Sequence, residues 1–216
     1  MMNELLVKDL LQAPEGSHDD VPPVDPLYDP LKVPEALAET ELMDIVVDVR
    51  RECMSMLFYL GGALHIDIGI GALYVARGLK SFTIDEFEGT GTRKIGVHTI
   101  GSSTPSIRNG RLSLELIGIY STRVSVESCS ASFYILDMPT VADPLPIYDE
   151  VSLEEIERSV PTMDKPGTVI AATHWTADPL DTTTCHRPRT EGNRTRRATL
   201  RSALKRRILG HSSSNA

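Results

Sequence analysis

The chain has 216 residues, 41% of them hydrophobic, and a formal net charge of −8, so it can bury one ordinary core. Its 14 prolines and its aromatic content of 5% indicate that part of the chain lies outside that core. No run reaches the roughly 20 apolar residues of a membrane-spanning helix, and the three cysteines, which lack CxxC spacing, imply neither a disulfide framework nor a zinc site. We therefore expect a chain without a membrane span, in a reducing compartment.

The charge is divided unevenly along the chain. Residues 1–160 carry 12 Lys and Arg against 26 Asp and Glu, a formal charge of −14, whereas residues 161–216 carry 10 against 4, a formal charge of +6. This split predicts an acidic body with a basic arm that could contact nucleic acid, anionic lipid or an acidic surface.

The first 34 residues are predicted to be a flexible acidic tail. Residues 3–12 place four leucines at the spacing of one short amphipathic helix, which would be marginal alone. Residues 13–34 hold six prolines and four aspartates, a composition that favours extended, solvated backbone over a packed core.

Residues 35–60 are predicted to form the long helix of the domain. Apolar residues from Leu42 to Leu60 recur at i, i+3, i+4 and i+7, and Gly61 and Gly62 would end the helix. The alternative makes residues 44–49 a strand, because the run DIVVDV is rich in β-branched residues and partly alternating.

The segment that follows mixes short strands with turns. The pattern predicts a strand over residues 64–70, a helix over 72–79, short strands over 82–84 and 94–100, and a loop over 101–110. The pair Asn109-Gly110 is typical of a tight turn.

Residues 111–137 organise the predicted sheet. Apolar and polar side chains alternate over 112–116, again over 124–126 and again over 133–135, which places one set on a core face. The connections are too short for crossover helices, so these runs should pair as an antiparallel meander.

The C-terminal third is predicted to contain three isolated elements. A capping box at Ser152 predicts a short helix to about Ser159, and residues 168–175 could form a strand. From Thr195 to Gly210 the sequence TRRATLRSALKRRILG predicts a basic helix with one apolar side.

Together these elements predict the α+β fold class. We expect one compact domain in which a long helix packs on a short-stranded antiparallel sheet, with disordered N- and C-terminal tails. The predicted parts are an acidic tail rich in Pro and Tyr (residues 1–34), the globular domain (35–160), and a polar linker with the basic arm (161–216).

Residues 65–88 contain the pattern most typical of an enzyme. Asp67, Gly69, Gly71 and Asp85 look like the nucleotide-binding loop of Rossmann-type methyltransferases, which implies glycines that let the backbone approach a cofactor and a second acid that binds ribose hydroxyls. The usual third glycine is absent, and the predicted meander does not suit a parallel sheet. A strand, a glycine turn and a core helix are therefore the preferred interpretation.

No other group of residues assembles into a catalytic or metal site on sequence grounds. The six histidines are far apart, and none lies at i, i+4 from another, so no metal ligands are predicted. The acidic pairs Asp85-Glu86 and Glu154-Glu155 are more typical of solvated ends than of a catalytic dyad. We name no catalytic residue, and expect no cofactor and no enzyme activity.

Two tyrosine segments carry the predicted partner-binding residues. Tyr28-Asp29-Pro30-Leu31 and Tyr148-Asp149-Glu150-Val151 are both Tyr-x-x-aliphatic, and an extended peptide of this form offers a partner two anchors. The predicted partner-binding residues are Pro22, Pro23, Tyr28, Leu31, Tyr148 and Val151.

The basic arm is the third candidate for a binding site. Its charges beside leucine and isoleucine suit adsorption to anionic lipid. Nucleic-acid phosphate would also satisfy them through counterion release, although no aromatic residue lies among them to stack on a base. A solvated arm that aids solubility or nuclear import is the remaining interpretation. The predicted membrane- or nucleic-acid-binding residues are Arg194, Arg196, Arg197, Arg201, Lys205, Arg206 and Arg207.

The layout resembles the matrix proteins of rhabdoviruses and their relatives. The tail from Pro22-Pro23-Val24-Asp25 to Tyr28-Asp29-Pro30-Leu31 carries the resemblance, with the meander that begins Gly110-Arg111-Leu112-Ser113-Leu114-Glu115-Leu116. Asp25 stands where the family's Pro-Pro-x-Tyr motif has tyrosine, and the basic charge is C-terminal here rather than N-terminal. The resemblance implies one α+β domain, self-association, contact with the inner leaflet of a membrane, and binding to a nucleocapsid.

The function predicted from the sequence is that of a viral matrix-type structural protein. It would self-assemble into a homo-oligomer, bridge the anionic membrane inner leaflet and the nucleocapsid or its RNA, and recruit host budding or sorting proteins through its N-terminal tail. It would lie in the host cytoplasm, at the inner face of the membrane and in the virion, and the arm would allow nuclear entry. The alternatives are a nucleic-acid-binding viral accessory or movement protein that uses the arm, and a methyltransferase-like nucleotide-binding protein.

Overall fold

The computed structural model describes residues 5–14, 20–86, 98–119, 122–147 and 150–178. In chain order the elements are β1 (Leu5–Leu6), the 3₁₀ helix η1 (Val7–Leu11), β2 (Glu41–Asp48), β3 (Cys53–Tyr59), β4 (Gly71–Glu86), β5 (His98–Arg108), β6 (Arg111–Gly118), β7 (Thr122–Asp137), α1 (Leu153–Ser159) and β8 (Pro166–Thr176). Within these ranges no helix is long and apolar enough to cross a membrane.

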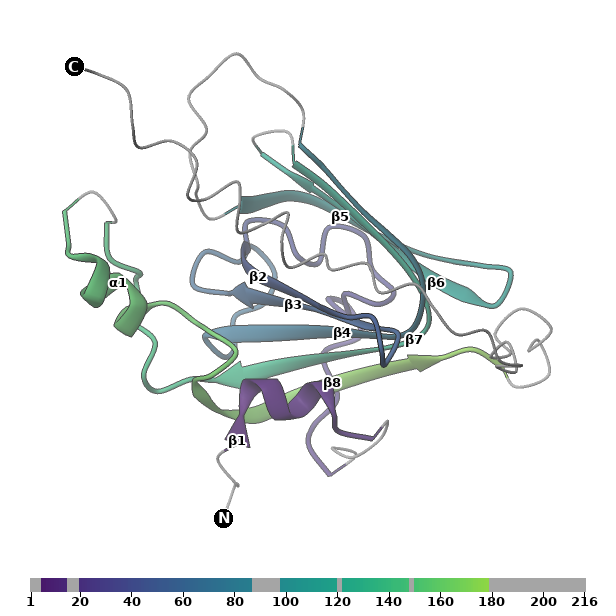
Figure 1. The fold of residues 1–216 in the computed structure, drawn as a ribbon, viewed down its shortest axis with the longest axis horizontal. Coiled ribbons are helices and arrows are strands. Elements are labelled where there is room, and N and C mark those ends of the chain that lie inside the picture. Colours follow the sequence, from purple (N-terminus) through teal and green to yellow (C-terminus); the bar gives the residue numbers. More distant parts are fainter. Residues whose placement is uncertain (1–4, 15–19, 87–97, 120–121, 148–149, 179–216) are drawn as a thin grey trace, which may run out of the picture. The chain divides into compact units, whose positions relative to one another are not determined.

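The strands form one antiparallel sheet that closes on itself. Their order is β1-β8-β7-β4-β3-β2-β5-β6, and β6 also pairs with β7. The 16-residue strand β7 makes this closure possible, because its first half pairs with β6 and its second half with β8, while β4 lies along its other side (Figure 1). The strand pair β4–β7 is therefore the element to which both ends of the sheet attach.

Both faces of the central strands are buried. Met56 on β3, Tyr74 on β4 and Phe133 on β7 lie side by side in the register and belong to a first core. Leu57 and Leu73, one position along, point to the opposite face and belong to a second core. Because successive residues of a strand alternate between faces, burial of both faces requires nearly continuous apolar sequence, which β3 has.

The N-terminal chain passes around the edge of β8 from the second core to the first. Leu10 and Val21 pack in the second core, whereas Val24 packs in the first. Between them, the Val24 N–H donates to the Ala172 carbonyl (3.2 Å) and the Ala172 N–H donates to the Pro22 carbonyl (3.0 Å). These bonds cover part of the outer edge of β8, which would otherwise present unpaired backbone groups.

The predicted α+β class with a long helix is wrong. Residues 41–48 and 53–59 form strands β2 and β3 in place of a helix over 35–60, and the described chain is mostly antiparallel sheet with the seven-residue α1. The helix prediction failed because a nearly continuous apolar run such as CMSMLFY fits the spacing of a helix as well as that of a strand. The alternative interpretation of residues 44–49 as a strand agrees with β2.

Three shorter predictions are also wrong. Residues 64–70 form a loop rather than a strand, residues 72–79 lie in β4 rather than in a helix, and residues 101–108 lie in β5 rather than in a loop. In β4, Gly78 adopts a φ of +61°, and the register with β7 shifts between Leu79 and Ser81. A glycine bulge of this kind lets the strand bend and continue, so glycine does not end the element.

Several local predictions are confirmed. Asn109 and Gly110 have positive φ and connect β5 to β6, and β6 and β7 are antiparallel neighbours, although the runs 124–126 and 133–135 form one strand. Helix α1 begins after Ser152, whose hydroxyl accepts from the Glu155 N–H. Strand β8 covers the predicted run but pairs with β7 rather than standing alone. The predicted helix over 195–210 lies outside the described residues.

Two cysteines of the described chain differ in their chemical state. Cys129 on β7 is disulfide-bonded, whereas Cys53 on β3 is a buried free thiol. The spacing of the cysteines in the sequence gave no indication of a disulfide.

Replacing a core leucine of β6 tests the closure of the sheet. Leu114 is fully buried between β5 and β7, so we expect Leu114→Ala to lower the free energy of unfolding by about 2–5 kcal/mol. The matched control is Ile117→Ala on the same strand, which is partly exposed and should cost about 1 kcal/mol or less. Urea denaturation measures both, and equal losses would contradict the placement of Leu114 in the core.

Candidate interaction surface around Tyr28

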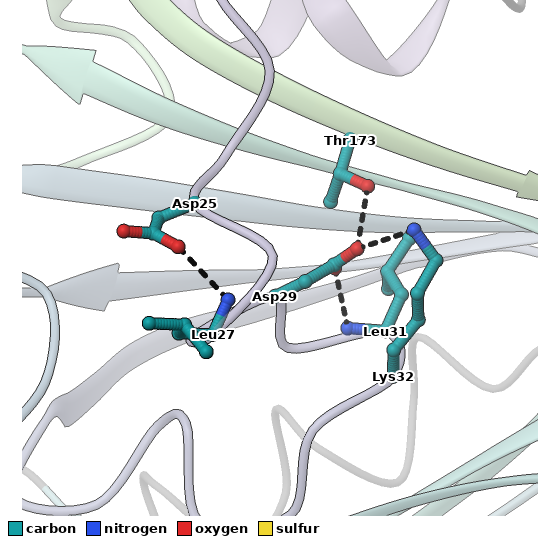
Figure 2. Close-up of polar contacts among 6 residues, drawn as sticks. All are labelled: Asp25, Leu27, Asp29, Leu31, Lys32 and Thr173. Atoms are coloured by element: carbon teal, nitrogen blue, oxygen red, sulfur yellow. Dashed lines mark hydrogen bonds and ion pairs between the residues drawn. The ribbon is translucent and has the colours of Figure 1, made fainter.

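Two consecutive turns shape residues 25–32. The repeated sequence Asp-Pro-Leu places an aspartate two residues before a leucine, and Figure 2 shows both carboxylates. Asp25 Oδ1 accepts from the Leu27 N–H at 2.9 Å, and Asp29 Oδ1 accepts from the Leu31 N–H at 3.0 Å. Aspartate before proline favours such turns, because its side chain replaces a backbone acceptor and proline fixes φ. The segment is therefore a double turn rather than the extended peptide that the sequence suggested.

The second turn is fixed to the sheet by the buried carboxylate of Asp29. Its Oδ2 accepts from Thr173 Oγ1 on β8 at 3.0 Å and from Lys32 Nζ at 2.7 Å (Figure 2). The Asp29 residue is 1% exposed, whereas the Lys32 side chain is largely exposed. A buried carboxylate is costly unless its oxygens are paired, and here three donors satisfy it. Asp29 thus holds residues 25–32 in one position on the protein.

The two turns direct their leucines differently. Leu31 is 1% exposed and packs in the first core, whereas Leu27 is 70% exposed. Tyr28 lies between them at the surface and stacks on His65, with ring centroids 5.4 Å apart and planes inclined by 7°. A partner could therefore bind both Tyr28 and Leu31 only if the second turn left the core. The two neighbouring side chains that are exposed are Leu27 and Tyr28.

The loop between β3 and β4 supplies the other half of this surface. His65 brings the loop against Tyr28, and its neighbours Leu64 (65% exposed) and Ile68 are exposed apolar side chains. The Leu64 N–H donates to the Ala38 carbonyl at 3.1 Å, which fixes the loop to the N-terminal segment. We call Leu27, Tyr28, Leu64, His65 and Ile68 the Tyr28 surface. Sequence reasoning missed Leu64, because the alternation over 64–70 indicated a strand. It missed Leu27, because the Tyr-x-x-aliphatic pattern begins at Tyr28.

The remaining sequence-predicted site residues are not part of the Tyr28 surface as defined. Pro22 and Pro23 are exposed where the chain crosses the edge of β8, and Val151 is partly buried before α1. Tyr148 and the basic residues 194–207 lie outside the described residues.

The residues of the methyltransferase alternative are not brought together. Asp67 and Gly69 lie in the loop before β4, and Asp85 lies near the opposite end of this 16-residue strand, which at about 3.3 Å per residue is far away. Both sheet neighbours of β4 are antiparallel to it. In the described part of the chain, no three His, Cys, Asp or Glu side chains are grouped so that they could hold a metal ion.

Comparison with known proteins does not assign the chain to a family. No protein-family model matches it, and no curated protein matches it. A solved structure with partial similarity is that of an uncharacterized protein from Neisseria gonorrhoeae, with a TM-score of 0.35 and 8% sequence identity over 44% of this chain and 90% of that chain.

Removal of the Asp29 carboxylate tests whether it holds the double turn. Asp29→Ala leaves the Leu31 N–H, Thr173 hydroxyl and Lys32 ammonium without their acceptor, so we expect a loss of roughly 1–3 kcal/mol in the free energy of unfolding and faster amide exchange over residues 20–34. The control Asp25→Ala removes the equivalent acceptor from the exposed turn and should cost roughly 0.5 kcal/mol. A smaller loss of unfolding free energy for Asp29→Ala than for Asp25→Ala would show that Asp29 does not hold the double turn.

Proposed function

We propose that this protein acts by binding, as a structural protein that associates with further copies of itself through the Tyr28 surface. The observation that carries the proposal is the exposure of Leu27, Tyr28 and Leu64 on two segments that the buried Asp29 and the Tyr28–His65 stack hold in place. Exposed leucines held on a fixed turn lose little conformational freedom on binding, which favours association.

The chemistry of the Tyr28 surface suits a protein partner. Aromatic residues such as tyrosine are enriched at the buried apolar centre of protein interfaces, and polar groups form the rim. Asp25 and Asp67 are exposed next to the apolar residues in sequence and would contribute to such a rim. A stable interface needs about 800 Å² from each partner, so we expect neighbouring parts of the surface to take part.

The proposal keeps the self-association expected from the sequence but does not depend on the likeness to matrix proteins. That likeness included a long helix packed on a sheet, and the structure has strands at those positions. A host partner that bound Tyr28 would contact the same exposed ring. Binding of that partner would therefore compete with self-association.

A charge placed on the Tyr28 surface tests the proposal. Leu27→Asp introduces a carboxylate at a position that is 70% exposed, so we expect the fold to persist and self-association to weaken by roughly tenfold or more, the effect of a lost interface contact of about 1.4 kcal/mol. Analytical ultracentrifugation over a concentration series measures the association.

The matched control for this experiment is Val49→Asp. Val49 is 75% exposed between β2 and β3 and is not part of the Tyr28 surface, so this variant should associate as the unaltered chain does. Equal weakening in both variants, or a chain that remains monomeric at every concentration, would refute the proposal.

A second candidate function is contact with an anionic surface through the basic arm. The observation that favours it is the formal charge of +6 over residues 161–216 against −14 over residues 1–160. Lysine and arginine near an anionic membrane contribute about 1 kcal/mol each, and salt screens this attraction. A matrix-type protein would use such an arm on lipid, and an accessory or movement protein would use it on RNA.

Neutralising the arm tests this second function. With Arg196, Arg197 and Arg206 changed to Gln, we expect the full-length protein to lose sedimentation with anionic vesicles at low salt, since three charge contacts are removed. A gel-shift assay with single-stranded RNA at the same salt concentration decides between the two ligands, because the preferred ligand is the one bound with the lower Kd. Binding to neither ligand at low salt by the unaltered chain would refute the candidate.

A further inference from the structure

A cavity of about 430 Å³ lies between the end of η1 and the paired strands β3 and β4. Residues 11–14 form one wall, and Arg51, Cys53 and Arg77 form the other. Cys53 and Arg77 are direct partners across the β3–β4 register, so their side chains leave the sheet on the same face. The cavity is open to solvent on one side, and its volume falls within the range typical of small-molecule sites.

Arg77 brings a positive charge into this cavity that no carboxylate of the described chain pairs with. Its Nη1 donates to Ser132 Oγ at 2.9 Å, and its Nη2 donates to the carbonyls of Leu10 (3.2 Å) and Ala13 (3.1 Å). All three acceptors are neutral. These bonds use three of the five N–H donors of a guanidinium and orient the group against the cavity wall.

Arg51 adds a second guanidinium that is loosely held. Its contact with Asp48 is 3.8 Å long, and its hydrogen bond to the Gln12 side chain is 3.5 Å long, both longer than strong charge-assisted bonds. The Arg51 side chain is largely exposed, so it can turn toward a ligand at small cost. The Asp48 carboxylate also accepts from the backbone N–H groups of Arg50 and Arg51.

The other described residues that line the cavity carry no charge. Cys53 is a free thiol, and burial raises its pKa, so at neutral pH it is protonated and carries no charge. Leu11, Ala13 and Pro14 are neutral and mostly apolar. A positive cavity is unusual on a chain whose residues 1–160 carry a formal charge of −14, because the general field of such a protein repels anions.

We propose that this cavity binds a small organic oxyanion, with its phosphate or carboxylate group held between the guanidiniums of Arg51 and Arg77 and its carbon part against Leu11 and Pro14. The exposed Arg51 can present its planar N–H fork to either anion, while Arg77 adds charge and the N–H donors that Ser132, Leu10 and Ala13 leave unused. The site lies on the second-core side of the sheet and is independent of the Tyr28 surface.

Thermal unfolding with simple anions tests the site. Inorganic phosphate and succinate, each compared with sodium chloride at equal ionic strength, distinguish phosphate from carboxylate as the preferred group. We expect at least one of them to raise the unfolding temperature of the full-length chain in proportion to the logarithm of its concentration above Kd, the behaviour of a ligand that binds the folded state. No rise above the chloride control with either anion would overturn the proposal.

Substitutions of the arginines test whether the anion binds in the cavity. Arg51→Gln should weaken binding of the effective anion roughly tenfold, which corresponds to about 1.4 kcal/mol. Arg50→Gln is the matched control, since Arg50 is exposed on the same turn but does not line the cavity. The Kd of this variant for the anion should equal that of the unaltered chain. Equal Kd values for the Arg51 and Arg50 variants would overturn the proposal. Arg77→Lys keeps the charge but removes the unused guanidinium N–H donors, and should weaken binding if the variant unfolds cooperatively.

Alkylation of the buried Cys53 thiol gives a second readout, at a residue that lines the cavity. The thiol lines the cavity, so a bound anion should slow its reaction with iodoacetamide, followed by peptide mass spectrometry at native pH. We expect the effective anion to slow the reaction in the unaltered chain and in the Arg50 variant, and to have less effect in the Arg51 variant. An unchanged rate at saturating anion would place the ligand elsewhere and overturn the proposal.

Discussion

The pairing of β4 with β7 is the constraint on which the rest of the structure depends. Each strand has 16 residues, twice the length of β6, so β7 can carry β6 on its first half and β8 on its second. A sheet built in this way has two faces at its centre that must both be covered. The nearly continuous apolar sequence of β3 and of residues 131–136 follows directly from that requirement.

The N-terminal chain provides much of this cover, although its composition is typical of a disordered segment. Leu10 packs on one face, Val24 and Leu31 pack on the other, and the crossing between them pairs with the edge of β8. Proline suits this path because the chain adds backbone bonds to the sheet at few positions, and a residue without an N–H loses nothing where no bond is made. Aspartate suits it because each Asp-Pro-Leu closes a turn locally.

The sequence predicted what local chemistry decides and missed what depends on distant partners. The turn at Asn109-Gly110 and the cap at Ser152 need only their neighbours in sequence, and both are confirmed. The helix over 35–60 was wrong because periodicity cannot separate a helix from a strand that is buried on both faces. Asp29 gave no sign of its role, since its partner Thr173 lies 144 residues away and a buried acid in a polar stretch looks the same as a solvated one.

The same N-terminal chain builds both candidate sites, which explains why they differ in character. Before the crossing, it lies against the face on which Arg77 emerges, and its carbonyls at Leu10 and Ala13 accept from that guanidinium. After the crossing, it is fixed by a carboxylate, Asp29, and displays leucine and tyrosine outward. A chain that needed only to cover the sheet could have used apolar residues throughout. The Arg77 charge, which no carboxylate of the described residues pairs with, and the exposed leucines on the other side exceed what cover requires. They are the features through which we propose that the protein binds.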